Sequence, residues 1–179
     1  MTDLSQDHFA PDAPWAEERP AHAFPEADRI EGLRCTPLNR RTHAKGALCE
    51  LITARPGVAH AIEEPVVHAY LVTAAPGSVR AWVFHERQAD RLAITDGDIV
   101  AVLYDLREDS PTHGALVELE LGAAAPGLLR IPPGVVHGVW NRGDRDAIFV
   151  NMPTTVFDLA DPDKKRLAID DPRIPYRFE

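Results

Sequence analysis

The amino-acid sequence predicts an all-β protein in which antiparallel strands close into a barrel. From Ile30 onward, apolar runs of strand length alternate with turn residues, and this pattern is typical of β-sandwiches and barrels. Pro-Gly pairs separate several of the runs, and Asp96, Gly97 and Asp98 separate two more, where glycine and aspartate tolerate the positive φ of a tight hairpin. The 179 residues, of which 45% are hydrophobic, suffice for one domain around a single core.

Ten strands follow from these breaks, with a further segment on either side. The predicted strands are Gly32–Leu38, Gly46–Ala54, Val66–Thr73, Ser78–His85, Arg91–Thr95, Ile99–Asp105, Ala115–Leu121, Gly127–Ile131, Val135–Asn141 and Ala147–Met152. After them, Asp161–Leu167 is predicted to form a short C-terminal helix, with Asp161 as N-cap and Pro162 in the first turn. Residues 1–28 are rich in proline and acidic side chains, so we expect an N-terminal arm that is partly disordered or docked on a partner subunit. The barrel domain is then residues 29–179.

Charge and composition exclude several classes of function. The net charge is −9 and the 19 basic residues are scattered along the chain, so no basic stripe is available for nucleic acid. No apolar run approaches the roughly 20 residues that cross a bilayer, and the N-terminus lacks the features of a signal peptide. Cys35 and Cys49 are too few for a disulfide framework or a thiolate metal site. We therefore expect a cytoplasmic protein that binds neither nucleic acid nor membrane.

A first motif places a histidine and a carboxylate around a predicted hairpin. Residues Gly77–Gly97 follow the spacing G-x5-H-x-H-x4-E-x6-G, with Val83 at the first histidine position, His85 at the second and Asp90 at the glutamate position. Side chains along a strand alternate between its two faces, so positions 83 and 85 share one face. Both are predicted to point into the barrel.

A second motif matches its pattern at every fixed position. Residues Pro132–Asn141 follow P-x-G-x-x-H-x-x-x-N, with His137 as the histidine. Together the two motifs resemble those of the cupin superfamily. That resemblance implies a jelly-roll barrel, also called a double-stranded β-helix, in which His85 and His137 project toward the same interior point.

A closer resemblance, over roughly residues 30–178, is to the dTDP-4-dehydrorhamnose 3,5-epimerase family. The matching pieces are Gly77–Arg80, Asp105–Gly114, Ile131–Gly138 and Asp170–Pro172. The resemblance implies an isomerase that removes a proton next to the C4 ketone of a nucleotide-linked sugar. In that family a histidine held by an aspartate is the base, and a tyrosine returns a proton on the other face. The ketone accepts the electrons, so no cofactor is expected.

The catalytic residues of that family are only partly kept. The base position falls on Val83 and the later histidine on His137, while the aspartate partner falls on Asp171 or Asp170. The tyrosine position falls near residues 156 and 157, which are valine and phenylalanine. Because His85 lies two residues from the lost base on the same strand face, we expect it to present an imidazole to the same cavity. The predicted catalytic residues are His85, His137 and Asp171.

The resemblance also implies a set of ligand contacts and a partner subunit. Arg80 matches an arginine of the family, Lys45 and Arg91 keep the charge of two other family residues, and the aromatic residues are expected to line or support the cavity. The predicted substrate-binding residues are Lys45, Glu50, Tyr70, Arg80, Trp82, Arg91 and Asn141. The ligand is expected to be a sugar nucleotide or a related metabolite. A homodimer is expected, with strands around Gly32–Ala54 exchanged so that Lys45 reaches the neighbouring site.

Two other interpretations stay open. His85, Asp90 and His137 supply two imidazoles and a carboxylate, which is the ligand type of a site for iron, zinc or manganese. This would make the chain a metal-dependent cupin enzyme. Loss of the family's base and tyrosine would instead fit a cupin that binds a sugar nucleotide or metabolite without catalysis.

Overall fold

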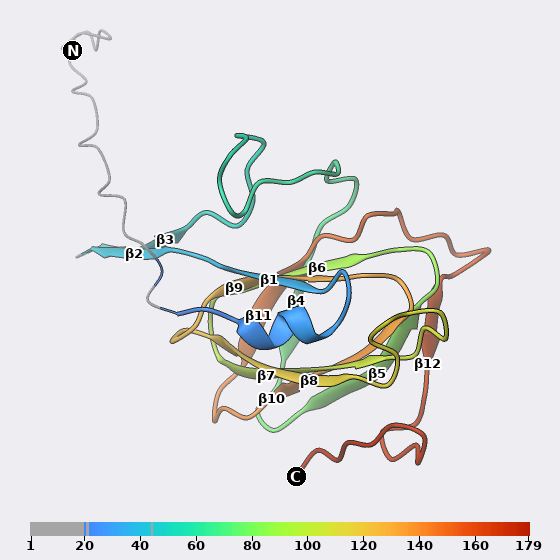
Figure 1. The fold of residues 1–179 in the computed structure, drawn as a ribbon. Coiled ribbons are helices and arrows are strands. Elements are labelled where there is room, and N and C mark those ends of the chain that lie inside the picture. Colours follow the sequence, from blue (N-terminus) through green and yellow to red (C-terminus); the bar gives the residue numbers. More distant parts are fainter. Residues whose placement is uncertain (1–19, 21, 44) are drawn as a thin grey trace, which may run out of the picture.

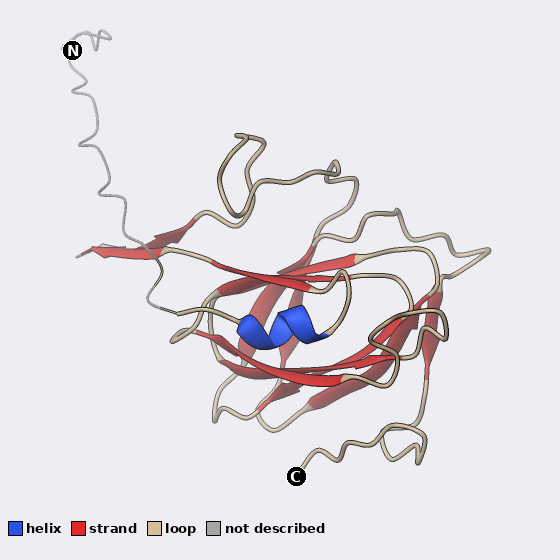
Figure 2. Cartoon of the chain, viewed as in Figure 1, coloured by secondary structure: helices blue, strands red, loops and turns tan. Residues whose placement is uncertain are grey.

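The computed structural model describes residues 20, 22–43 and 45–179 of the chain, and its regular secondary structure is almost entirely β, with long loops between the strands (Figures 1 and 2). Most of the predicted N-terminal arm lies outside the described residues. No helix in the described part is long and apolar enough to span a membrane. In chain order the elements are the 3-10 helix η2 (Pro25–Arg29) and the strands β1 (Arg34–Pro37), β2 (Arg40–His43), β3 (Gly46–Cys49), β4 (Tyr70–Ala74), β5 (Val79–His85), β6 (Asp90–Ile94), β7 (Asp98–Asp105), β8 (Leu116–Gly122), β9 (Gly127–Ile131), β10 (Val135–Asn141), β11 (Ala147–Asn151) and β12 (Lys164–Arg166).

Two five-stranded antiparallel sheets face each other and form the barrel (Figure 1). The first has the order β1-β9-β6-β11-β4 and the second the order β12-β5-β10-β7-β8, while β2 and β3 form a separate hairpin. From β4 onward the chain crosses repeatedly between the sheets, so that strands adjacent in sequence mostly lie in different sheets. This topology confirms the predicted jelly-roll barrel.

The predicted strands all have counterparts. Strands β9 and β10 have the predicted bounds, and most other boundaries differ by a few residues. The short strand β2 was not predicted, because its sequence, Arg40-Arg41-Thr42-His43, is polar and lacks the apolar alternation of a half-buried strand. It pairs only with β3, in a hairpin that stands away from the two sheets (Figure 1).

The predicted C-terminal helix is wrong. The segment Asp161–Leu167 contains strand β12, which pairs with the edge of β5. The carboxylate of Asp163 accepts hydrogen bonds from three consecutive backbone N–H groups, those of residues 86, 87 and 88, at 2.8–3.0 Å. These bonds hold the chain beside an open strand edge, where ladder hydrogen bonds outweigh the weak helix tendency of seven residues.

The barrel interior is apolar over most of its length and polar at one end. Helix η2 closes the apolar part, where Ala27 and Ile30 pack with inward residues of both sheets such as Ile94 and Leu103. A second apolar cluster lies on the outer face of the second sheet, where the C-terminal segment places Ile174 against Trp82. The C-terminal residues are therefore part of the folded core, but they pack outside the barrel. One end of the barrel interior is left to polar side chains.

Candidate active site

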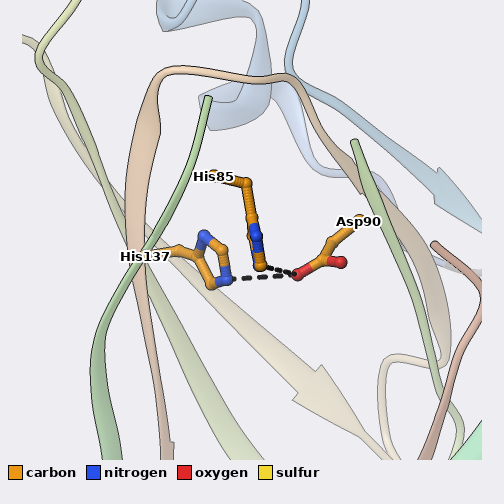
Figure 3. Close-up of side chains that lie close together, drawn as sticks. All are labelled: His85, Asp90 and His137. Atoms are coloured by element: carbon orange, nitrogen blue, oxygen red, sulfur yellow. Dashed lines mark ion pairs between the residues drawn. The ribbon is translucent and has the colours of Figure 1, made fainter. Parts of the chain in front are cut away.

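Three buried polar side chains meet at the polar end of the barrel (Figure 3). His85 from β5 and His137 from β10 belong to the second sheet, and Asp90 from β6 belongs to the first. The Nε2 atoms of His85 and His137 lie 3.4 and 3.3 Å from the same oxygen, Asp90 Oδ2. Each residue is at most 6% exposed, and the two rings stack with centroids 5.9 Å apart. The structure thus brings together the histidines of both sequence motifs and the aspartate between them.

Strand pairing explains why these side chains converge. Strands β5 and β10 are neighbours in which Val83 is the cross-strand partner of His137, so His85, two residues further along, faces the same side. Asp90 begins β6, directly after the turn that leaves β5, and its inward neighbours on β6 are Leu92 and Ile94. Side chains therefore alternate between the inward and outward faces in both sheets, as the sequence predicted.

The second nitrogen of each imidazole faces a backbone carbonyl. His85 Nδ1 lies 3.2 Å from the carbonyl oxygen of Asp163, and His137 Nδ1 lies 3.3 Å from that of Val135. A carbonyl oxygen only accepts hydrogen bonds, so each Nδ1 carries a proton and donates it. In a neutral ring the Nε2 atom then holds a lone pair, and Nε2 of His85 lies 3.3 Å from the side-chain amide nitrogen of Gln88, which donates to it.

Asp90 is a fixed negative charge. Its other oxygen, Oδ1, accepts hydrogen bonds from the side-chain amides of Gln88 at 2.8 Å and Asn151 at 3.2 Å. Burial acts to raise the pKa of Asp90, but the hydrogen bonds and charges that His137 and His85 supply when Nε2 is protonated outweigh burial and hold this pKa well below its usual range. The carboxylate is therefore ionised at neutral pH.

The cluster is consequently built to hold a positive charge. One donor atom from each of His85, Asp90 and His137 lies within 4.8 Å of the other two. Two imidazole lone pairs and a carboxylate oxygen repel one another at this spacing unless protons or a cation lie between them. The arrangement suits either proton transfer at Nε2 or the binding of a metal ion.

Both sheets also line the space beside this cluster. A small inner cavity is bounded by Asp90 and His137, and a larger one of about 880 Å³ is bounded by His85 and by the loop of residues 153–163. Tyr70 and Lys164 line both cavities. The cluster is therefore reachable by a small molecule.

Tyr70, at the start of β4, enters the cavity from the first sheet. Its hydroxyl oxygen accepts a hydrogen bond of 2.8 Å from Asn151, the last residue of β11. Burial, with the charge of Asp90, raises the pKa of Tyr70, so the phenol keeps its proton at neutral pH. The sequence did not single out Asn151, although a polar residue at an inward position after Ala147 and Phe149 was a usable signal.

Arg80 reaches the cavity because β5 is irregular. Along the pairing with β10, the partners are His137 with Val83 and Val139 with Arg80, so two steps on β10 match three on β5. The extra residue is a β-bulge, which reverses the alternation beyond it. Arg80 lines the inner cavity with Val83, although simple alternation from position 83 would have turned it outward.

Asp171 is not the partner of the histidines. Its carboxylate is bound by Arg173 at 2.7 Å, and the carboxylate at the histidines is Asp90. The reason lies in packing, because Ile174 anchors this part of the C-terminal segment to the outer face of the second sheet.

Two other predicted contacts also lie elsewhere. Trp82 is fully buried on that outer face, where its Nε1 donates to the carbonyl of Ile169. Asn141 is buried further along β10, and its side-chain amide donates to three backbone carbonyls, those of residues 74, 75 and 145. Neither side chain faces the cluster. Both stabilise the fold through their burial and their hydrogen bonds to backbone carbonyls.

The remaining predicted contacts lie outside the barrel interior. Arg91 points to the outer face of the first sheet, and its guanidinium donates to the carbonyls of residues 64, 65, 152 and 153. These four hydrogen bonds tie the loop before β4 to the barrel. Glu50 pairs with His60 at 3.1 Å, and Lys45 is exposed at the tip of the β2–β3 hairpin. None of the three reaches the cluster within this chain.

Comparison with known proteins identifies the family. The model of the dTDP-4-dehydrorhamnose 3,5-epimerase family matches residues 27–178. The chain belongs to this family. It is therefore a member of an isomerase family, as the motifs predicted, and its changed base position is a departure within that family.

Individual members of this epimerase family agree. The chain is 41% identical over 108 residues to a probable low-salt glycan biosynthesis epimerase of Haloferax volcanii, covering 60% of this chain and 69% of that protein. It is 31% identical over 149 residues to the spore coat polysaccharide biosynthesis protein SpsL of Bacillus subtilis, covering 83% and 96% of the two chains. A dTDP sugar isomerase of Desulfovibrio desulfuricans superposes with a TM-score of 0.76 at 28% identity, covering 84% of this chain and 92% of that one.

The depressed pKa of Asp90 predicts loss of stability in acid. An unfolded aspartate titrates at about pH 3.9, so below that pH the unfolded chain takes up a proton that folded Asp90 resists. The ionised Asp90 carboxylate thus stabilises the folded state above about pH 4, and this stabilisation is lost as the pH falls. Urea unfolding between pH 6 and pH 2.5 measures this slope. Asp90→Asn should flatten it, while Asp146→Asn, which changes an exposed carboxylate, should leave it unchanged.

Proposed function

We propose that the chain epimerises a nucleotide-linked 4-keto sugar by removing a proton from the carbon next to the ketone. Family membership supports this reaction class. The observation that carries it is the pair of inward imidazoles, His85 and His137, whose Nε2 atoms share one carboxylate beside a cavity that also holds a tyrosine hydroxyl. Base, counter-charge and proton donor are thus present in one site.

His85 is proposed as the base in place of the family residue. Val83, at the family's base position, is a buried side chain that cannot accept a proton. His85 Nε2 takes the proton from the sugar carbon, and the Asp90 carboxylate stabilises the imidazolium that forms. The hydrogen bond from Nδ1 to the carbonyl of Asp163 keeps the ring in orientation during the transfer. The carbon's electrons move onto the ketone oxygen, which becomes an enolate.

Tyr70 is proposed to return the proton. Inversion at a carbon requires that the proton leave on one face and arrive on the other. Tyr70 comes from β4 of the first sheet, whereas His85 comes from β5 of the second, so the two groups approach the cavity from opposite sheets. The Asn151 amide donates to the phenol oxygen, which leaves the phenol proton for a ligand and stabilises the phenolate that remains.

Asn151 gives independent support for a polar ligand. Its Oδ1 atom is buried and has no hydrogen-bond partner among the described residues. A buried acceptor without a donor costs about 1–3 kcal/mol. A sugar hydroxyl in the cavity would supply the missing hydrogen bond.

Solvent deuterium exchange tests the assignment. In D2O, the wild type should exchange the hydrogen next to the ketone of dTDP-4-keto-6-deoxyglucose, and His85→Ala should slow this exchange by about 10²–10⁴-fold. Tyr70→Phe should keep the exchange but lose net inversion, as followed by NMR. His60→Ala, which removes an imidazole on the surface loop, is the control.

Two outcomes would count against this function. Exchange that survives in His85→Ala would place the base elsewhere. A wild type that binds the keto sugar without any exchange would instead indicate a ligand-binding cupin.

A second candidate, a metal-dependent cupin enzyme, is favoured by the protonation pattern of the cluster. Both histidines donate Nδ1–H to backbone carbonyls, which is how imidazole metal ligands are commonly oriented. With Asp90 they offer two nitrogens and an oxygen, a donor set that fits iron, zinc or manganese. A bound ion would supply Lewis-acid polarisation of a ligand oxygen.

Metal titration separates the two candidates. Under the second, metal-free protein should bind one equivalent of Fe(II), Zn(II) or Mn(II) by calorimetry, and His85→Ala, Asp90→Ala and His137→Ala should each abolish binding while His60→Ala keeps it. Binding that survives in Asp90→Ala, or deuterium exchange that persists at full rate in chelator, would contradict a metal-dependent reaction.

We also propose a homodimer. The β2–β3 hairpin stands away from the sheets (Figure 1) with Leu48 exposed, and Leu71 of β4 and Ile148 of β11 are exposed on the first sheet. A second copy would cover these apolar side chains.

Light scattering tests the dimer. The measured mass should be twice that of one chain, and Leu71→Glu should lower this mass; a monomeric wild type would refute the proposal. Strand exchange and the cytoplasmic location stay predictions.

A further inference from the structure

The side-chain amide of Gln88 lies beside the proposed base. Gln88 is partly buried between β5 and β6, and it lines the larger cavity together with His85. Its Nε2 atom lies 2.8 Å from Asp90 Oδ1 and 3.3 Å from His85 Nε2. A carboxylate oxygen only accepts hydrogen bonds, so the Gln88 atom that faces Asp90 is the amide nitrogen. One N–H of this amide is therefore bound to Asp90, and the other is directed to the lone pair of the base.

Three hydrogen bonds hold the Gln88 amide in place. The backbone N–H of Gln88 donates to Asp163 Oδ2 at 2.8 Å, and its side-chain Oε1 accepts from the hydroxyl of Thr155 at 3.0 Å. With the bond to Asp90, the residue is fixed at its backbone and at both ends of its amide group. A donor that is fixed in this way needs no reorganisation when negative charge develops next to it.

The proposed reaction creates a negative charge that requires such a donor. When the C–H bond next to the ketone breaks, the proton goes to His85 Nε2 and the electron pair forms a carbon–carbon double bond to C4. The π electrons of the C4 carbonyl move onto its oxygen, which becomes an enolate. A donor at this oxygen lowers the barrier, because it binds the developing charge more strongly than it binds the neutral ketone.

We propose that the Gln88 amide donates a hydrogen bond to the ketone oxygen and is therefore a catalytic residue. This inference rests on the proposed function, with His85 as the base. The reacting carbon must approach His85 Nε2, where it displaces one N–H of Gln88 from the lone pair. The ketone oxygen is two bonds from this carbon, about 1.5 and 1.2 Å long, so it lies within reach of the released N–H. The second N–H stays on Asp90, and no proton leaves Gln88.

Lys164 is a cationic alternative for the same role. It lines both cavities and is the cross-strand partner of His85. Its side chain is exposed on β12, and within the described part of the chain no hydrogen bond joins its ammonium group to the base. The Gln88 amide, in contrast, already donates at the nitrogen where the reaction takes place. The position of the N–H therefore favours Gln88 over Lys164.

Infrared spectroscopy of the bound ketone tests this contact. With dTDP-4-keto-6-deoxyglucose that carries ¹³C at C4, the carbonyl stretch should move to lower frequency on binding to the wild type, because a hydrogen bond weakens the double bond. Gln88→Met keeps the length of the side chain but has no amide N–H, so it should reverse this shift. It should also slow deuterium exchange by about 10²-fold with a smaller effect on KM, since the donor acts mainly on the developing charge.

Two further variants serve as controls. Glu86→Gln changes an exposed carboxylate of the same turn and should keep the wild-type exchange rate and carbonyl shift. Thr155→Val removes the hydroxyl bound to Oε1 but leaves the amide N–H groups, so the carbonyl shift should remain. Gln88→Met keeps the backbone N–H that binds Asp163, so this variant should fold, as thermal melting will verify.

The outcomes separate this inference from the proposed function. A wild-type complex without a carbonyl shift, or an unchanged shift and exchange rate in Gln88→Met, would overturn the role of Gln88 even if the keto sugar is epimerised. A shift that is lost in Lys164→Gln but kept in Gln88→Met would also overturn it and assign the ketone to Lys164. Wild-type protein that shows the Gln88-dependent shift but exchanges no hydrogen would keep the contact and refute the epimerase.

Discussion

The buried carboxylate of Asp90 joins the two sheets of the barrel at their polar end. A charge with 4% exposure needs hydrogen-bond donors or a positive charge at its oxygens. Asp90 Oδ1 accepts from the side-chain amides of Gln88 and Asn151, and Oδ2 faces His85 and His137 of the other sheet, which meet the need when a proton or cation lies between them. The requirement fixes the positions of both imidazoles and of the amide that holds Tyr70. One electrostatic constraint therefore sets the geometry of the whole site.

The loop and strand after β11 complete the site from outside the barrel. Asp163 binds the turn between β5 and β6 through its carboxylate and orients His85 through its carbonyl. The strand that follows covers the free edge of β5 and brings Lys164 and Arg166 to the cavity. A segment that lacks strong strand propensity thus determines both the orientation of the proposed base and the charge at the cavity, because it is held by hydrogen bonds to the barrel.

The site differs from the family's pattern at the base and tyrosine positions. Val83 fills the position of the family's base, yet the alternation of β5 offers a second inward position at His85. The family's tyrosine is missing near residues 156 and 157, and Tyr70, from a different strand, brings a hydroxyl to the cavity. Arg91 keeps the charge of a family lysine but is occupied by backbone carbonyls on the outer face, so charge alone did not preserve a ligand contact.

The sequence by itself determined the jelly-roll barrel, most of its strands, and the convergence of His85 and His137, because alternation along a strand and turn chemistry are local properties. It also marked Asp90, by motif spacing. Only the tertiary structure decided that Asp90, and not Asp171, is the partner of the histidines, since that choice depends on which face of a sheet the C-terminal segment covers. The bulge that turns Arg80 inward and the pairing that makes β12 a strand were likewise beyond the sequence, because both arise from hydrogen bonds between residues far apart in the chain.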